Sequence, residues 1–248
     1  MPDLLTLEWD VDRNGYSIEV LSPSDIEWDN PNTEPFEYPL KAGANNSLVL
    51  IAKEWGTTTL DQSNPTTFLV GNSQSCRQYD PMVDHAGLFR EFAETKCTIP
   101  DVKAFVDQYG LPYKKHVAPI EDVYREIKRM RKAVNSWEKA RKSGDLSPFV
   151  SAYNTTLRSL LSQELGLSAD PRYATFKISP MDLFDALWLQ LGQAVANRTD
   201  LKRCLWCPKW FPYGSGTGKR KSGHYCSDRC RKAAWNKENE EKKRKVKK

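Results

Sequence analysis

The chain has 248 residues, of which 39% are hydrophobic and 28% are charged, a composition typical of a globular protein of one or two domains. No apolar stretch approaches the roughly 20 residues of a membrane-spanning helix, and the N-terminal sequence has neither the basic nor the apolar region of a secretory signal, which argues against membrane and secreted classes. We therefore expect a cytoplasmic protein, in which paired cysteines are more often metal ligands than disulfides.

Charge is distributed unevenly along the chain. Residues 201–248 contain 16 lysines and arginines and 4 acidic residues, a local charge of +12. Residues 1–200 contain 21 basic and 28 acidic side chains, a charge of −7. An acidic body with a basic C-terminal segment favours a polyanion as the partner of that segment. Two simpler explanations stay open: the segment keeps the protein soluble, or it folds back on the acidic body.

The first third of the chain is predicted to be rich in β-strands. The dipeptide Asn14-Gly15 lies between two apolar stretches, a pattern typical of a β-hairpin turn. Residues 22–40 contain four prolines and many acids, which predicts an extended connector. Residues 56–78 are mostly polar and predict a loop that contains one strand. Strands are expected at 4–11, 15–21, 47–56 and 67–71.

From about residue 85, apolar residues recur at the three- and four-residue spacing of α-helices. Thr98 followed by Asp101 is a helix-capping pattern, and Gly110 and Gly144 are expected to end helices. One further strand is expected at 172–179. Helices are expected at 86–95, 98–110, 120–143, 147–166 and 179–195. Their apolar stripes are expected to pack with the N-terminal strands into one α+β body.

Four cysteines lie close together near the C-terminus. Cys204 and Cys207 form a C-x2-C pair, Cys226 and Cys230 form a C-x3-C pair, and 18 residues separate the pairs. Two such pairs predict a tetrahedral Zn²⁺ site with four protein ligands, built from a knuckle, a loop and the first turn of a helix.

The same residues predict two further details of this zinc-binding segment, which we call the finger. Ser227 is a candidate cap for the helix that carries Cys230. His224 is an alternative to Cys226 as third ligand, although that choice would leave a thiol beside the metal. Cys76 and Cys97 show no pairing pattern and are expected to be ordinary thiols.

The zinc is expected to be structural, because four protein ligands leave no position open for water. No nucleophile, base and orienting group are apparent together, so we expect no enzyme. His85 and His116 are expected to be surface or helix-flanking residues. A nuclease whose acidic residues lie in the N-terminal half remains an alternative.

Cations and aromatic residues alternate in the same segment. Cations on a rigid metal-held module suit phosphate contacts, and the aromatic residues are expected mainly to cover the metal, with one or two free to reach a base or sugar. The candidate nucleic-acid contacts are Lys219, Arg220, Lys221, Arg229, Arg231 and Lys232. The interleaved aromatic residues are Trp206, Trp210, Phe211, Tyr213 and Trp235.

The stretch from Arg203 to Lys237 resembles the CGNR-type zinc fingers of prokaryotes, which have a cysteine pair, a basic loop, an aromatic-Cys-Ser sequence and a last cysteine that opens a basic helix. The segments "YDPMVDHAGLFREFAE" and "VKAFVDQYGLP" are similar to the helical domain that precedes that finger in stress-linked transcription regulators. The resemblance implies that the four cysteines are zinc ligands and that the finger binds DNA. The chain differs from the family in having Cys230-Arg231-Lys232-Ala233 where the family has Cys-Gly-Asn-Arg.

Together these features predict an α+β protein with a treble-clef-like or ribbon-like zinc finger. We divide the chain into a β-rich region (1–84), a helical domain (85–199), a zinc finger (200–237) and a basic tail (238–248) expected to be disordered. The leading hypothesis is a DNA-binding transcription regulator, with DNA favoured over RNA as the partner and the acidic body sensing a signal or contacting a protein. The alternative is a zinc-stabilised protein-interaction module that binds no nucleic acid.

Overall fold

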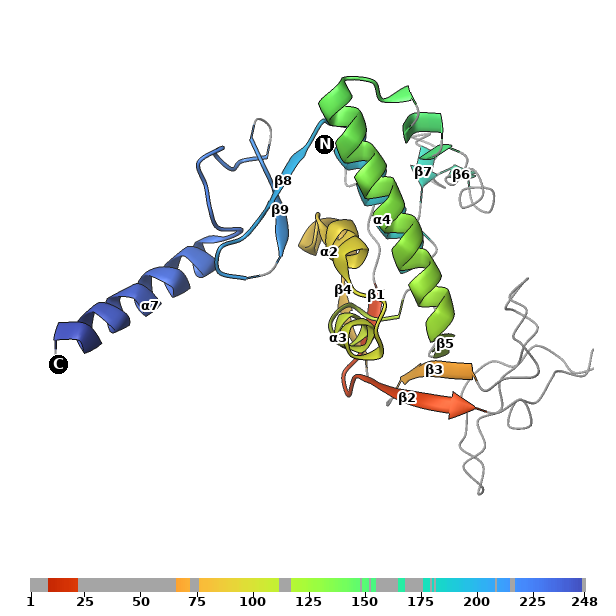
Figure 1. Ribbon diagram of the computed structural model, residues 1–248, viewed down its shortest axis with the longest axis horizontal. Helices are drawn as coiled ribbons and strands as arrows, with labels where there is room; N and C mark the ends of the chain where they lie inside the picture. The colour runs from red at the N-terminus through yellow and green to blue at the C-terminus, as the bar shows by residue number, and fades with distance from the viewer. Residues whose placement is uncertain are drawn as a thin grey trace, which may run out of the picture.

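The computed structural model of the protein describes residues 9–21, 66–71, 76–111, 117–147, 149–151, 153–154, 165–167, 176–178, 180, 182–207, 209–214 and 217–246. In these residues, N-terminal strands pack with a helical core, followed by a β-hairpin with four clustered cysteines and a final helix (Figure 1). The predicted α+β class is therefore confirmed. No helix in this part of the chain is both long and apolar enough to cross a membrane.

The N-terminal strands belong to two small antiparallel sheets. Strand β1 (Trp9–Asp12) pairs with β4 (Cys76–Tyr79). Strand β2 (Tyr16–Leu21) pairs with β3 (Thr66–Gly71), which also pairs with β5 (Val117–Pro119). The predicted strand at 67–71 is confirmed as part of β3, whereas the strand at 47–56 and the connector at 22–40 lie outside the described residues.

The hairpin predicted at Asn14-Gly15 is wrong, although the turn itself forms. Gly15 has a φ of +70° and donates its N–H to the Asp12 carbonyl at 3.2 Å, but the strands on either side belong to different sheets. The reason is a contact with helix α3 (Ile99–Tyr109): Asp107 Oδ1 accepts a hydrogen bond from the Tyr16 N–H at 2.8 Å. A Cβ on Gly15 would lie 2.8 Å from that same oxygen. The turn therefore docks on α3 instead of closing a hairpin.

Four of the helices before the finger are those that the periodicity predicts, and their ends follow the capping residues, whereas the one-turn helix at Pro81–Asp84 was not predicted. Thr98 Oγ1 accepts from the Asp101 N–H and begins α3, while Gly110 and the left-handed Gly144 end α3 and α4. The described helices are α1 (Pro81–Asp84), α2 (Leu88–Glu94), α3, α4 (Ile120–Ser143) and α6 (Leu183–Ala196).

The helix predicted at 147–166 is only partly correct. Residues 149–151 and 153–154 are helical, but β6 (Leu165–Leu167) is a strand paired with β7 (Phe176–Ile178). Gly166 has a low helix propensity, and its backbone pairs instead with Lys177 in the antiparallel ladder between β6 and β7. The strand predicted at 172–179 is confirmed over β7.

The core lies between α2, α3, α4 and α6, where aromatic side chains dominate. Phe92 of α2 contacts Phe105 and Phe184, with ring centroids 5.2 and 5.4 Å apart. Phe89 lies 6.2 Å from Trp137 of α4, and both side chains are fully buried. Each such residue contributes roughly 1.5–3 kcal/mol through its burial, so α2 is held firmly in the body.

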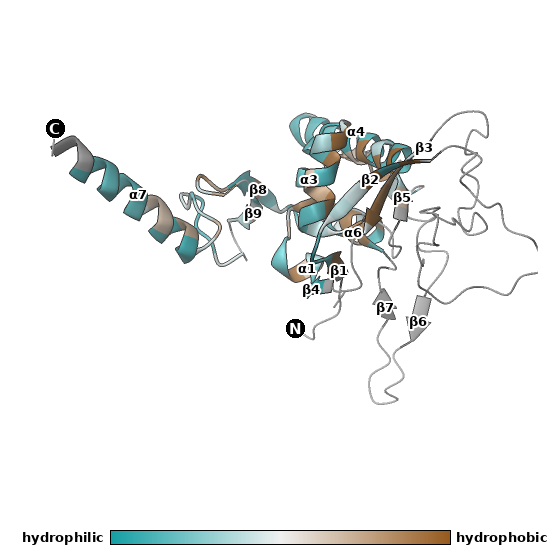
Figure 2. Cartoon of the chain, turned by 90° about the horizontal axis from the view of Figure 1, so that it is seen from below, coloured by the Kyte–Doolittle hydropathy of each residue, from teal (hydrophilic) through white to brown (hydrophobic). Residues whose placement is uncertain are grey.

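The last helix, α7 (Asp228–Val246), extends away from this core (Figure 1). It is hydrophilic on nearly every side (Figure 2), unlike α4 and α6, which have apolar inner faces. Residues 238–246, predicted to be a disordered tail, instead continue this helix. The exposed charged residues of α7 up to Lys243 are thus presented on a regular helix that begins at the cysteine cluster.

Candidate metal centre

The first cysteine pair lies in the turn of a β-hairpin. Strand β8 (Asp200–Arg203) pairs with β9 (Trp210–Tyr213), and Arg203 opposite Trp210 is the last pair before the turn. The Cys204 N–H continues the ladder by donating to the Lys209 carbonyl at 3.0 Å. The turn therefore brings Cys204 and Cys207 to the same end of the hairpin, as the C-x2-C spacing predicts.

The second pair lies at the start of α7 and is held against the hairpin by the backbone. The Leu205 N–H donates to the His224 carbonyl at 3.0 Å, which brings the segment before Cys226 beside the turn. Ser227 Oγ accepts from the Cys230 N–H at 3.2 Å, so Ser227 caps α7 as predicted. Because it lies in the first turn of that helix, Cys230 shares a face with Cys226.

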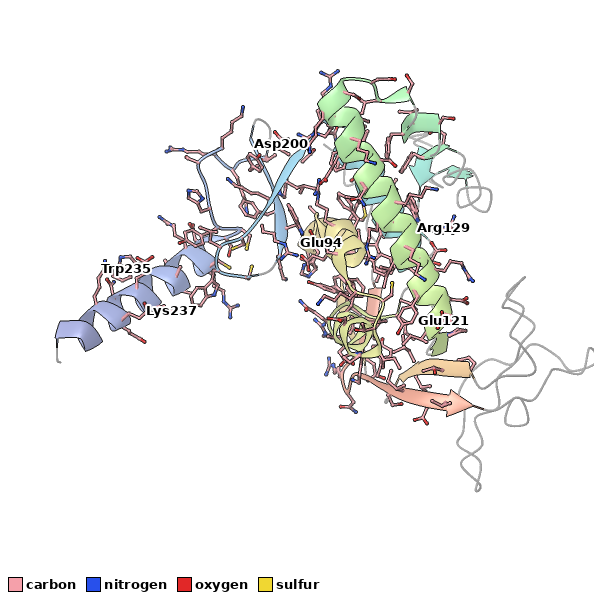
Figure 3. The ribbon with its side chains drawn as sticks, viewed as in Figure 1. Glu94, Glu121, Arg129, Asp200, Trp235 and Lys237 are labelled. Atoms are coloured by element: carbon pink, nitrogen blue, oxygen red, sulfur yellow. The ribbon has the colours of Figure 1, made fainter. Side chains whose placement is uncertain are left out.

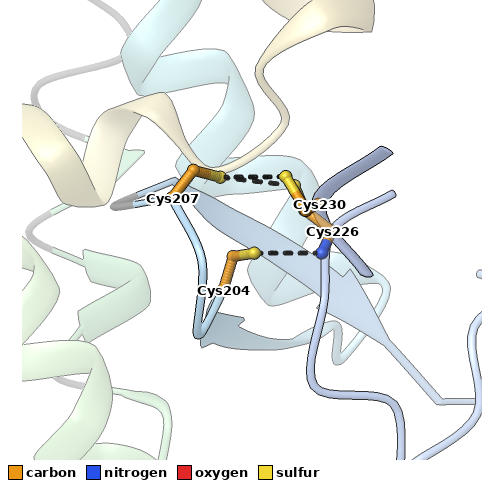
Figure 4. Close-up of side chains that lie close together, drawn as sticks. All are labelled: Cys204, Cys207, Cys226 and Cys230. Carbon is orange, nitrogen blue, oxygen red and sulfur yellow. Dashed lines mark hydrogen bonds between the residues drawn. The ribbon is translucent and has the colours of Figure 1, made fainter. Parts of the chain in front are cut away.

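All four sulfur atoms lie within 4.8 Å of one another (Figure 4). Cys226 Sγ is 3.4 Å from Cys207 Sγ and 3.4 Å from Cys230 Sγ, and the Cys207–Cys230 distance is 3.7 Å. These separations are far longer than the ~2.05 Å of a disulfide. They are close to the ~3.8 Å edge of a tetrahedron whose centre is ~2.3 Å from each sulfur. The four cysteines are thus positioned to hold one metal ion.

Without a cation, the thiols of the cluster differ in their pKa values. Burial tends to raise the pKa of Cys204, but backbone N–H donors outweigh it and lower the pKa to about 6; they include the N–H groups of Trp206 at 3.5 Å and Cys226 at 3.4 Å. Burial and the neighbouring thiols of Cys207 and Cys230 raise the pKa of Cys226 to about 12. Four sulfurs this close are all thiolates only when a cation lies between them.

Sequence reasoning left His224 open as a replacement for Cys226. The cluster contains Cys226, and His224 contributes its backbone carbonyl to the knuckle. Cys97 lies apart from the cluster, with its thiol 3.9 Å from the Tyr124 carbonyl. His116 and the side chain of Cys76 lie outside the described residues.

The predicted phosphate contacts divide into two kinds. Lys219 is half-buried: its ammonium group donates to the Cys226 carbonyl and lies 5.2 Å from the Phe211 ring centroid. Lys219 therefore connects the loop to the backbone of Cys226, a member of the cysteine cluster. The other candidates are exposed on the loop and on α7, namely Arg220, Lys221, Arg229, Arg231 and Lys232.

Trp210, one of the interleaved aromatic residues, attaches the finger to the body. Its backbone N–H donates to Glu91 Oε1 at 3.1 Å and its indole N–H to Glu94 Oε2 at 3.1 Å. Glu94 also forms an ion pair with Arg203, and Arg90 lies over the Trp210 ring at 4.7 Å. Glu94 extends from α2 toward the hairpin in Figure 3.

A second group of side chains from the body also takes part in this junction between the finger and the body. Glu91 Oε2 accepts from the Tyr109 hydroxyl at 2.6 Å, and burial raises the pKa of the Glu91 carboxyl. His85 lies edge-on to Tyr79 and Tyr109, and its Nε2 is 3.4 Å from the Lys209 ammonium. Burial, helped by the charge of Lys209, lowers the pKa of His85 to about 4, which leaves its ring neutral at pH 7.

Sequence reasoning missed this junction. The prediction that His85 flanks a helix is correct, since His85 directly follows α1, but its contact with Lys209 was not predicted and neither Glu91 nor Glu94 was singled out. One signal was present: Glu91 and Glu94 are acidic residues on the non-core side of α2, whereas the finger is basic. Charge alone did not identify which acids would contact it.

A comparison with protein-family models found no match to this chain, and comparisons with curated proteins and with solved structures found none either. The similarity to CGNR-type fingers therefore stays a prediction. What the structure supports is the coarser statement that a four-cysteine cluster near the C-terminus is positioned to bind a metal ion.

Proposed function

We propose that this is a zinc-finger protein that binds nucleic acid through its finger and α7. The observation that carries the proposal is the placement of exposed cations around the cysteine cluster. Arg220 and Lys221 lie on the loop, and Arg229 and Lys232 lie on the first turns of α7, all exposed. They belong to a segment of charge +12 attached to a body of charge −7, which is the charge distribution expected for a phosphate-binding module.

Zinc is the metal that suits this donor set. Four thiolates in a tetrahedron are typical of structural Zn²⁺. Zinc bound there would join the knuckle to the start of α7 and so hold the cations in place. With four protein ligands it has no position for a substrate, so its proposed role is structural.

DNA as the partner and transcription regulation as the role are the finer part of the proposal. They are supported by the resemblance of the stretch from Arg203 to Lys237 to DNA-binding fingers. The acidic body, joined to the finger through Trp210, would then sense a signal or contact a protein partner.

The proposal is tested by measuring the affinity of the metal-loaded protein for DNA and RNA, single-stranded and duplex, over a range of salt concentrations. Replacing Arg220, Lys221, Arg229 and Lys232 by glutamine should weaken binding. It should also reduce the salt slope by up to ~0.9 for each duplex DNA phosphate that the variant no longer neutralises. The matched control replaces four exposed lysines of α4 by glutamine, Lys128, Lys132, Lys139 and Lys142. It has the same change in charge and should bind normally.

Two results would contradict the proposal. Absence of salt-dependent binding to any of the four nucleic acids would reject it outright. An equal loss of binding in the α4 control would show that only the net charge matters and that the finger is not the binding site.

A protein-interaction module is the second candidate, and one observation favours it. The knuckle exposes two large apolar side chains, Leu205 at 71% and Trp206 at 43%. Replacing both by serine should abolish capture of a protein partner if the finger binds one. Unchanged binding of nucleic acid by the same variant would assign that activity to the cations instead.

A further inference from the structure

One large aromatic side chain stands on the free face of α7. Trp235 is 64% exposed and lies five residues after Cys230, beyond the turn that packs on the cysteine cluster. It points away from α7 on the side opposite Lys237 (Figure 3). An indole of this size is usually buried, so its exposure on a projecting helix requires an explanation other than the packing of the finger.

The helix surrounds Trp235 with charged and polar groups. Arg231 and Lys232 precede it by four and three residues, which places their Cβ atoms ~5–6 Å away on the same face. Lys242 follows on that face two turns later, and all three cations are exposed. The Arg231 guanidinium pairs with Asp228, yet both side chains remain solvent-exposed, at 65% and 82%. The indole therefore has two cations on its N-terminal side, whereas the nearest same-face positions on its C-terminal side are Glu238 and Asn239.

This pattern does not fit a helix that docks its apolar face into a protein groove. Such a helix presents apolar residues at three- and four-residue steps. The corresponding positions around Trp235 are Arg231, Lys232, Glu238, Asn239 and Lys242. A single exposed aromatic ring next to Arg231 and Lys232 instead matches a ligand that combines negative charges with flat apolar faces.

We propose that Trp235 is a stacking platform for an unpaired base, with Arg231 and Lys232 contacting the adjacent phosphates. The ligand class is single-stranded nucleic acid, because a duplex hides the faces of its bases and offers only edges and backbone to a helix. This inference rests on the proposed nucleic-acid binding, not on the proposed role in transcription, and deepens it: the cations supply attraction to any nucleic acid, and Trp235 selects strands with unpaired bases.

The test compares Trp235→Leu with Trp235→Phe, using oligothymidine, an abasic oligonucleotide of equal length and a duplex. Loss of base stacking should weaken binding of oligothymidine to Trp235→Leu by roughly 5- to 150-fold, and Trp235→Phe should retain most of the affinity. Binding of the abasic strand and of the duplex should be the same in both variants as in the unmodified protein. The salt slope should not change, because every cation that faces the phosphates is still present.

Helix content and metal content, measured on the same samples, show that neither variant has altered the finger. Equal affinity of Trp235→Leu and the unmodified protein for oligothymidine would overturn the inference while leaving the proposed function standing. So would an equal loss on the abasic strand, because no base is there to stack. Failure of the unmodified protein to bind any nucleic acid would instead overturn both.

Discussion

The backbone N–H of Trp210 in the finger donates a hydrogen bond to the Glu91 carboxylate of the helical body, with 3.1 Å between the nitrogen and oxygen atoms. The same tryptophan directly follows the metal knuckle, and Glu91 also binds the Tyr109 hydroxyl of α3. The finger and the body are therefore connected through a half-buried carboxylate. Changes at the metal site and in the body should affect each other.

Gly87 should be essential to this connection. A Cβ at position 87 would lie 2.4 Å from the Trp210 Cβ, although the Gly87 φ of −114° is open to any residue. Replacing Gly87 by alanine should lower the free energy of unfolding by about 1–3 kcal/mol because the finger cannot dock without displacement. Urea denaturation measures the change. Ala86→Ser, at the neighbouring exposed position, is the control, and equal stability of the two variants would contradict the contact.

His85 should make stability depend on pH. Its folded-state pKa of about 4 lies below the unfolded value of 6.5, so the unfolded chain takes up the proton first as the pH falls. Stability should therefore be lost from pH 6.5 down to pH 4, by ~1–2 kcal/mol after allowance for the partial exposure of the ring.

The measurement is the free energy of unfolding at several pH values for the unmodified protein and for His85→Gln. Loss of metal at low pH affects both proteins, so the difference between them isolates the histidine. A difference that stays constant from pH 4 to pH 7 would show that His85 does not titrate in this way.

Lys219 and Lys221 carry the same charge but should have different roles. The Lys219 ammonium binds the Cys226 carbonyl and the Phe211 ring, whereas the Lys221 side chain is exposed. Lys219→Met should weaken metal retention by roughly 5- to 30-fold, since it removes a charge-assisted hydrogen bond and a cation–π interaction. Lys221→Met should leave it unchanged. Competition with a chelator measures the effect, and identical retention in both variants would make Lys219 an ordinary surface cation.

The cysteine cluster should bind one zinc ion per chain. Replacing any one of Cys204, Cys207, Cys226 and Cys230 by serine should lower the metal content sharply, because each supplies a quarter of the coordination shell. Elemental analysis of purified protein measures this directly. Cys97→Ser and His224→Ala are the controls and should retain a full equivalent. Metal-free unmodified protein, or loss of metal in His224→Ala alone, would require a different ligand set.

The metal site was predictable because the information for it is local. A C-x2-C turn directs two thiols toward one point. Ser227 caps the helix whose first turn places Cys230 beside Cys226, so each pair is defined within a short stretch of chain. Helix ends were predictable for the same reason, as Thr98, Gly110 and Gly144 act on their own backbone.

Strand pairing was less predictable, because the partner of a strand is chosen by distant residues. The Asn14-Gly15 dipeptide forms its turn, but Asp107 accepts a hydrogen bond from the Tyr16 N–H, and β1 and β2 belong to different sheets. Strands β4 and β5 have four and three residues, too few for periodicity to reveal. They exist because β1 and β3 offer them hydrogen-bonding edges.

Composition, spacing and capping residues were thus enough for the α+β class, the cysteine cluster and the separation of charge, since each depends on neighbours along the chain. The attachment of the finger to the body was not accessible in this way. Trp210 and Glu91 are 119 residues apart, and many acids and aromatic residues were equally plausible partners. Their contact arises only when the packed core holds α2 beside β9. The role of Lys219 was also decided by the tertiary structure, because the fold of the finger brings its ammonium group to the Cys226 carbonyl and the Phe211 ring.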